Sequence, residues 1–267
     1  MRAGYEPQMP FSKNADATLR YDRAGSGPAV LLVHGWACNR SFWDRQVQAL
    51  RETHTVITVD LRGHGESSRP QKGYSVGAMT ADLEQLVRTL GVPRVAVVGW
   101  SMGGMVALEL ARRLGPKVSA LGLVCTTAGG LVPTDSDEAK AIQKEVADDF
   151  RAFARGFAAR LFKDHETQPL YAWALSQVQK TPGSVASACL TSLMTFDVRT
   201  TLGQLDVPTV VFHGRHDELI PYAHGEALQK SVKGAELVTF EQSGHTPQLE
   251  EVEAFNAALA RLLARAR

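Results

Sequence analysis

Short apolar runs alternate with amphipathic stretches in the first half of the chain. Between two of these runs, apolar residues recur at spacings of three and four from Val76 to Leu90, after a serine that can cap a helix and before a glycine that can end it. Buried strands that alternate with helices predict a mostly parallel sheet covered by helices on both faces. The runs typical of buried strands are 29–33, 55–60, 94–99 and 120–125.

The pattern changes after Gly129, and the chain is helical in character from about residue 131 to residue 196. Strand-like runs return at 207–213 and 236–240. A last helix is expected to begin near Pro247, because proline suits the first turn of a helix.

We therefore expect an α/β core in two parts, residues 1–130 and 197–267, interrupted by a helical cap at 131–196. A chain of 267 residues is long enough to bury a large core of this kind. An insertion between two strands whose ends carry chemistry would lie over the site as a cap.

The composition changes this picture little. A formal net charge of +1 gives no overall attraction to nucleic acid or to an anionic membrane. No stretch approaches the roughly 18–20 apolar residues needed to span a bilayer, and the N-terminus lacks the apolar run of a signal peptide. Three widely spaced cysteines fit free thiols in a reducing compartment. We expect a cytoplasmic protein without nucleic-acid or membrane partners.

One serine stands in a glycine-rich turn between a predicted strand and a predicted helix. Residues 99–103 read GWSMG and fit the pattern G-x-S-x-G, with Ser101 at the centre. A serine in so tight a turn needs glycines on both sides, and the turn projects its Oγ above the strand ends, beside a helix N-terminus. We predict that Ser101 is a nucleophile; a glycine-rich helix start without chemistry is the alternative.

Such a serine needs a base to take its proton in the transition state. Among eight histidines, His245 lies in a loop after the last predicted strand, where it can reach the edge of the sheet. Asp217 follows the preceding strand, with Glu218 beside it as the weaker candidate, whereas the strand that ends at Cys125 is followed by no carboxylate. The predicted set is Ser101, Asp217 and His245, in the chain order expected with this motif.

The remaining histidines have structural interpretations. We expect His34 to be a hydrogen-bonding residue at a strand end and His224 to lie at the surface. The group formed by His213, His216 and Asp217 has the composition of a metal site. A strand end followed by a tight turn would point the two imidazoles apart, so no metal and no other cofactor is predicted.

The first strand of the core ends at His34, and Gly35 and Trp36 follow it. A backbone N–H just after this strand can pair with the N–H of the residue after the nucleophile. The predicted oxyanion hole therefore consists of the amides of Trp36 and Met102. Two such donors lower a barrier by several kcal/mol.

These motifs together resemble the α/β-hydrolase superfamily over nearly the whole chain. Within it, the chain is most similar to small serine carboxylesterases, including the pimeloyl-carrier-protein methyl ester esterases. The resemblance implies an α/β-hydrolase fold and cofactor-free ester hydrolysis. The motifs that carry it are HGW at 34–36, DLRGHGES at 60–67, GWSMGG at 99–104, GRHD at 214–217 and GH at 244–245.

Inside the cap, one helical stripe from Ala139 to Leu161 is apolar, and basic residues occupy the opposite face. Apolar pocket walls would favour small to medium apolar acyl groups. The basic face is either a solvated surface or a docking site for an acidic carrier protein. The expected pocket residues are Trp100, Phe153, Phe157 and Trp173, and the basic residues are Lys140, Lys144, Arg151 and Arg155.

The predicted function is a carboxylesterase that works through an acyl-enzyme on a small-molecule ester. A lactonase or thioesterase, including one for carrier-linked esters, would use the same residues. A cofactor-free haloperoxidase or perhydrolase and a hydroxynitrile lyase are further alternatives on this scaffold. A non-catalytic ligand receptor is the alternative from a different class, because a receptor can retain the same three residues.

Overall fold

The structure is a computed structural model that describes residues 10–14, 16–129 and 135–266. Within these ranges the strands form one eight-stranded sheet in the order β1-β2-β4-β3-β5-β6-β7-β8. The strands are β1 (Phe11–Asn14), β2 (Ala17–Ala24), β3 (Ala29–Val33), β4 (Thr55–Val59), β5 (Val95–Trp100), β6 (Val118–Val124), β7 (Thr209–Gly214) and β8 (Glu236–Phe240).

Strands β3 to β8 are parallel to one another, whereas β2 pairs in the antiparallel sense with both β1 and β4. Every residue of β3, β4, β5, β6 and β7 is buried, which explains why these strands are nearly continuous apolar runs. The mostly parallel α/β sheet expected from the sequence is confirmed. The β1–β2 hairpin was not predicted, because its mixed polar and apolar sequence carries no such run.

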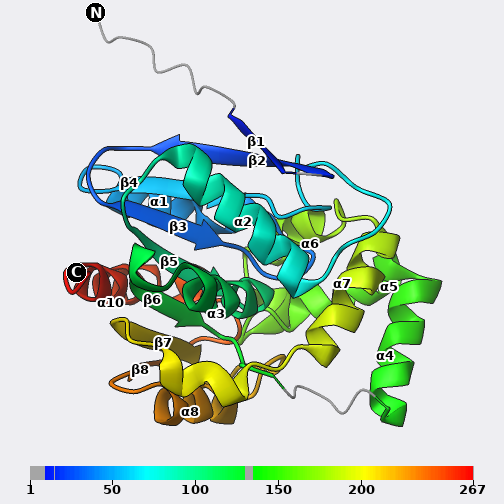
Figure 1. The fold of residues 1–267 in the computed structure, drawn as a ribbon. Helices are drawn as coiled ribbons and strands as arrows, with labels where there is room; N and C mark the ends of the chain where they lie inside the picture. Colours follow the sequence, from blue (N-terminus) through cyan, green and yellow to red (C-terminus); the bar gives the residue numbers. More distant parts are fainter. Residues whose placement is uncertain (1–9, 15, 130–134, 267) are drawn as a thin grey trace, which may run out of the picture.

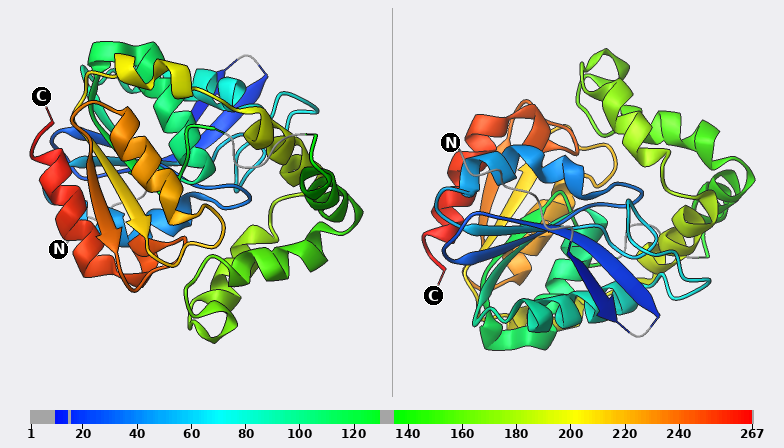
Figure 2. Two further views of the ribbon diagram at one scale, coloured as in Figure 1. Left: turned by 90° about the horizontal axis from the view of Figure 1, so that it is seen from below. Right: turned by 90° about the horizontal axis from the view of Figure 1, so that it is seen from above.

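Helices cover both faces of this sheet (Figures 1 and 2). Helices α1 and α10 pack on one face, and α2, α3 and α8 pack on the other. Short 3-10 turns η1 (Arg40–Trp43), η2 (Gly115–Lys117), η3 (His165–Thr167) and η4 (Arg199–Gln204) connect several elements. The helices are α1 (Asp44–Leu50), α2 (Val76–Leu90), α3 (Met102–Leu114), α4 (Asp137–Asp148), α5 (Phe150–Ala159), α6 (Tyr171–Val178), α7 (Gly183–Thr195), α8 (Tyr222–Ser231), α9 (Pro247–Glu250) and α10 (Val252–Leu263).

Helices α4 to α7 lie between β6 and β7 in the chain and form a separate layer beside the sheet (Figure 2). Gly129 and Asp197 form an isolated antiparallel bridge, so the two ends of this insertion lie side by side. The expected cap boundary at residues 130 and 131 falls outside the described residues.

The apolar stripe expected from Ala139 to Leu161 is divided between two helices. Asp149 has non-helical backbone angles and ends α4, and its carboxylate then caps α5 by accepting a hydrogen bond from the Ala152 amide at 3.0 Å. The last predicted helix is likewise divided, at Glu251, into α9 and α10. The residue pattern predicted the buried face but not the break, because an aspartate can sit in a helix or cap one.

None of the helices in the described ranges has the length and apolar character needed to cross a membrane.

Backbone packing around the start of α3 leaves no room for a side chain at Gly103. A Cβ added there would lie 2.3 Å from the Val33 carbonyl oxygen and 2.5 Å from that of His34. We expect Gly103→Ala to lower the free energy of unfolding by about 3 kcal/mol, because the clash is with backbone that cannot rotate away. Gly156→Ala is the matched control: it lies in α5 with no atom within 4 Å of an added Cβ. It should raise stability by about 0.5–1 kcal/mol. Urea denaturation measures the free energy of unfolding of both variants. Equal effects would show that backbone packing at Gly103 is not the cause.

Candidate active site

Ser101 stands in a strained turn between β5 and α3. Its backbone angles are φ 56° and ψ −121°, a region that residues with a side chain rarely occupy. Glycine is required nearby, since a Cβ at Gly99 would lie 2.1 Å from the Gly103 carbonyl oxygen. The result is a serine held at the start of a helix, with its side chain at a cavity. This is the turn that the sequence motif predicts.

His245 lies in the loop between β8 and α9, and two hydrogen bonds hold its backbone in place. The indole Nε1 of Trp100 donates a hydrogen bond to the His245 carbonyl oxygen at 2.7 Å. The His245 amide donates to the carbonyl oxygen of Leu161 in the cap at 3.0 Å. The buried imidazole lines the same cavity as Ser101. These contacts fix the position of the ring without using its nitrogens.

The Nδ1 atom of His245 lies 2.8 Å from Oδ2 of Asp217. The aspartate is in the loop after β7, and its Oδ1 accepts hydrogen bonds from the amides of Leu219 and Ile220, both at 2.9 Å. Burial alone would raise the pKa of Asp217, but its contacts with His245 and His213 outweigh burial and hold that pKa well below its usual range. The carboxylate is therefore ionised at neutral pH, and His245 carries its proton on Nδ1, which leaves Nε2 as a proton acceptor.

Glu218, the weaker candidate for the acid, points elsewhere. Its carboxylate is exposed and lies 3.2 Å from Nε2 of His165. The structure thus brings Asp217, and not its neighbour, to His245.

Glu250 fastens the histidine loop to the cap and was not anticipated from the sequence. Its carboxylate accepts hydrogen bonds from the amides of Lys163 at 2.8 Å, Gly244 at 3.0 Å and Thr246 at 3.3 Å. Burial raises the pKa of Glu250, against the effect of these donors. The only local signal is an acidic residue in the first turn of a helix, which is too common to mark a site.

The predicted oxyanion donors lie on either side of the serine. Met102 is the first residue of α3, and Trp36 follows Gly35 in the loop after β3. Among the described residues, neither backbone amide donates to another protein group. A Cβ at Gly35 would approach the Cβ of Ser101 to 3.2 Å, so this loop lies directly against the serine. Both amides are available to an oxygen bound beside Ser101.

A cavity of about 550 Å³ lies between the serine turn and the cap. Its walls are mostly apolar and include Trp36, Met102, Phe153 and Phe157. Carboxylates from α4 and the Asp217 loop also reach it, together with one arginine. The remaining lining residues are Met105, Glu138, Ala141, Ile142, Glu145, Arg160, Leu190, Leu193, Met194, Glu218, Leu219, Ile220, Pro221 and His224.

Two of the four expected pocket residues lie elsewhere. Trp100 is buried beneath the site and stacks on Phe42, and Trp173 also packs against Phe42. Trp100 is on the strand that precedes the serine, so its ring turns into the core and supports His245. His224, which we expected at the surface, is half-buried and lines the cavity.

His34 has the expected structural role. Its Nε2 accepts a hydrogen bond from the Leu61 amide at 3.0 Å, and its Nδ1 lies 2.8 Å from the Gly35 carbonyl oxygen. Burial lowers the pKa of His34 to about 4. A neutral ring is required for this arrangement, because one nitrogen accepts while the other donates.

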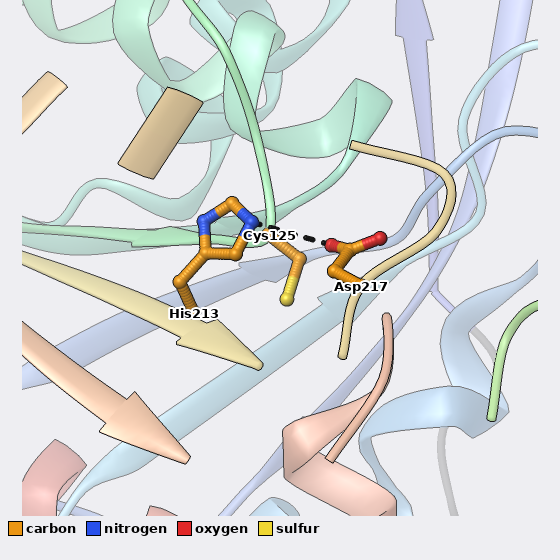
Figure 3. Close-up of side chains that lie close together, drawn as sticks. All are labelled: Cys125, His213 and Asp217. Carbon is orange, nitrogen blue, oxygen red and sulfur yellow. Dashed lines mark ion pairs between the residues drawn. The ribbon is translucent and has the colours of Figure 1, made fainter. Parts of the chain in front are cut away.

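Cys125, His213 and Asp217 lie close enough together to suggest a metal site (Figure 3). Nε2 of His213, however, is 2.9 Å from the Ile220 carbonyl oxygen and must carry a proton toward it. Burial and the adjacent Asp217 raise the pKa of the Cys125 thiol well above its usual range. A protonated nitrogen and a neutral thiol are poor ligands, so this group does not suit a metal ion. His216, the other imidazole considered, is exposed.

Comparison with known proteins places these features in a family. The family described as alpha/beta hydrolase fold matches residues 28–252. A pimeloyl-[acyl-carrier protein] methyl ester esterase from Nitrosomonas europaea is 30% identical over 250 residues, covering 90% of this chain and 97% of the relative. A putative non-heme chloroperoxidase from Synechocystis is 28% identical, covering 94% and 96%. An esterase from Exiguobacterium antarcticum has a similar structure, with a TM-score of 0.88, 28% identity and coverage of 94% and 97%.

Asp217→Asn should lower kcat by about 10⁴-fold, because its amide oxygen is used by the Leu219 and Ile220 amides. Its NH2 group then donates to Nδ1 and holds His245 in the wrong tautomer. Glu218→Gln is the matched control, one position along the chain with a carboxylate that lines the cavity but pairs with His165 and not with His245. It should change kcat by less than about twofold, with any effect on substrate binding seen in KM. Steady-state ester hydrolysis measures both, and the reverse result would make Glu218 the acid.

Proposed function

The chain belongs to the alpha/beta hydrolase fold family, and from that premise we propose that it is a serine carboxylesterase with Ser101, His245 and Asp217 as its catalytic triad. One observation carries the proposal: a histidine bonded to a buried carboxylate at 2.8 Å lines the same cavity as a serine in a strained turn. Relatives and structural neighbours named as esterases support the same reaction.

The proposed mechanism is a two-step acyl transfer. Oγ of Ser101 attacks the ester carbonyl carbon while Nε2 of His245 takes the hydroxyl proton, and Nδ1–H stays bonded to Asp217. The amides of Trp36 and Met102 hold the oxyanion; loss of one such donor typically costs about 2.7–4 kcal/mol of barrier. The C–O bond then breaks, and His245 returns its proton to the leaving alcohol. Water repeats the sequence and frees the acid.

The cavity supports a neutral, mainly apolar acyl group. Its volume of about 550 Å³ and its aromatic walls suit a small to medium chain. Near the cap, the lining carries three glutamates, Glu138, Glu145 and Glu218, against the single cation Arg160. This excess of negative charge favours neutral esters over anionic ones.

A fluorophosphonate should label Ser101 covalently, and p-nitrophenyl esters from acetate to dodecanoate should give a burst followed by turnover. We expect kcat/KM to rise with chain length and then fall once the chain exceeds the cavity. Ser101→Ala should abolish labelling and lower kcat by about 10⁶-fold while leaving the circular dichroism spectrum unchanged. If the unmodified chain shows neither labelling nor a burst, the result favours a non-catalytic receptor. Halide oxidation without ester turnover would favour the peroxidase alternative.

A carrier-linked ester is the second candidate substrate, favoured by the relatives named for that reaction and by the basic residues of the cap. Lys140 and Lys144 lie on α4, but each is paired with an acidic neighbour on the same helix. Arg151 and Arg155 on α5 form no ion pair within the described ranges. By helical phase, Arg151 and Arg155 fall opposite to the cavity-lining residues of α5. Lys140 falls opposite to those of α4, whereas Lys144 lies at their flank. A carrier docked there would contact the outside of the cap.

Charge reversal separates the two substrate classes. In Arg151→Glu/Arg155→Glu, the kcat/KM for a carrier-linked ester should fall at least about tenfold and lose its salt dependence, while that for a free butanoate ester stays unchanged. Glu138→Lys/Glu145→Lys is the matched control on the cavity side of the same layer. If both substrates behave alike in both variants, docking of a carrier on this face is excluded.

A further inference from the structure

A second histidine contacts the aspartate of the proposed triad. His213 is at the end of β7, and its side chain is fully buried. Its Nε2 lies 3.4 Å from Oδ2 of Asp217 (Figure 3). The same oxygen lies 2.8 Å from Nδ1 of His245. The same Nε2 is 2.9 Å from the carbonyl oxygen of Ile220. One imidazole N–H therefore faces two oxygens of the short loop that carries the acid.

The tautomer of His213 follows from its other nitrogen. Nδ1 is buried and has no hydrogen-bond partner among the described residues. It faces Gly225 of α8, where an added Cβ would lie only 2.6 Å away. A proton on Nδ1 would be stranded, whereas a proton on Nε2 has two acceptors. The side chain is thus a neutral imidazole with its N–H on Nε2.

We propose that His213 is a positioning residue for Asp217: its Nε2–H, shared between Ile220 O and Asp217 Oδ2, fixes the carboxylate and limits the negative charge presented to His245. This inference rests on the proposed triad. The carboxylate then has donors on both oxygens, two backbone amides on Oδ1 and two imidazoles on Oδ2. With four donors around it, rotation away from His245 would break several contacts at once.

Few other groups near Asp217 could donate a hydrogen bond that fixes its carboxylate. The Cys125 thiol approaches from β6, and Tyr222 of α8 meets the His213 ring edge-on with centroids 5.7 Å apart. His224 of α8 is the next titratable group on that side, and burial lowers its pKa. The negative charge of Glu250 on α9 adds to the effects that raise the pKa of the Cys125 thiol. Among these groups the Cys125 thiol also contacts Asp217, but a thiol is a weaker donor than an imidazole N–H.

Removal of the His213 donor should have two effects. The carboxylate becomes freer to rotate, so the histidine is aligned in fewer molecules and kcat falls. The carboxylate also becomes more electron-rich, so it stabilises a protonated His245 more strongly, and the acidic limb of the pH profile moves to higher pH. A residue that merely supported the Ile220 loop would affect stability and leave this limb in place.

The test uses three variants at one position in the full chain. His213→Leu and His213→Asn remove the donor, because the asparagine amide is too short to reach Asp217. His213→Gln places an N–H near the position of Nε2. We expect the first two to lower kcat for p-nitrophenyl butanoate about tenfold, to change KM less than about twofold, and to raise the midpoint of the acidic limb by about half a pH unit. The glutamine variant should recover kcat to within about threefold of the parent and return the midpoint of the acidic limb to the parent value.

Two controls complete the experiment. In an Asp217→Asn background, His213→Leu should no longer move the acidic limb, because the carboxylate is gone. The low-field proton resonance of His245 Nδ1–H should shift in His213→Asn and return in His213→Gln. Unchanged kcat and pH profile in all three variants, with a lower melting temperature, would overturn the proposal. If the proposed triad is wrong, the result is distinguishable, because the fluorophosphonate would then not label Ser101 in the parent chain.

Discussion

The close backbone packing around Ser101 is the constraint on which the rest of the site depends. The turn places the serine at φ 56° because β5 must pass directly into α3 above the sheet. The carbonyl groups of β3 press against Gly103, and the loop after β3 presses against the serine itself through Gly35. Strain of this kind persists only where the surrounding structure holds it. The buried parallel strands supply that support, and they bring the two predicted oxyanion amides to the serine at the same time.

The cap and the catalytic loop are parts of one network of contacts. Leu161 of the cap segment accepts hydrogen bonds from the His245 amide and from the Thr246 hydroxyl, and Glu250 ties Lys163 to the same loop. On the other side, the Trp36 indole donates to Ala186 of α7 at 2.9 Å. The same ring meets Phe150, Phe153 and Phe157 of the cap edge-on. The layer that lines the cavity therefore also helps to hold His245 and the loop that carries Trp36.

Different parts of the chain carry the proposed reacting residues and the walls that would select the substrate. The loops after the strand ends position Ser101, Asp217 and His245, and the triad that we propose from them could cleave an ester, a lactone or a thioester alike. Selectivity depends on the cap, whose apolar inner face and acidic rim meet the substrate, while its basic outer face looks away from the cavity. Relatives with different named activities on the same scaffold are consistent with this division.

The amino-acid pattern was enough to predict the parallel sheet, the serine turn and the positions of Asp217 and His245 in loops after strands. Each depends on local features: aliphatic strands, glycines beside a strained residue, and polar side chains just after strand ends. It did not determine that Trp100 would support His245 from below, that His224 would face the cavity, or that Glu250 and His213 would gather around the acid and base. Those roles arise between segments far apart in the chain, such as β7 with α8 and the cap with α9. Long-range packing decides which side of a residue meets which neighbour, and no local pattern encodes that choice.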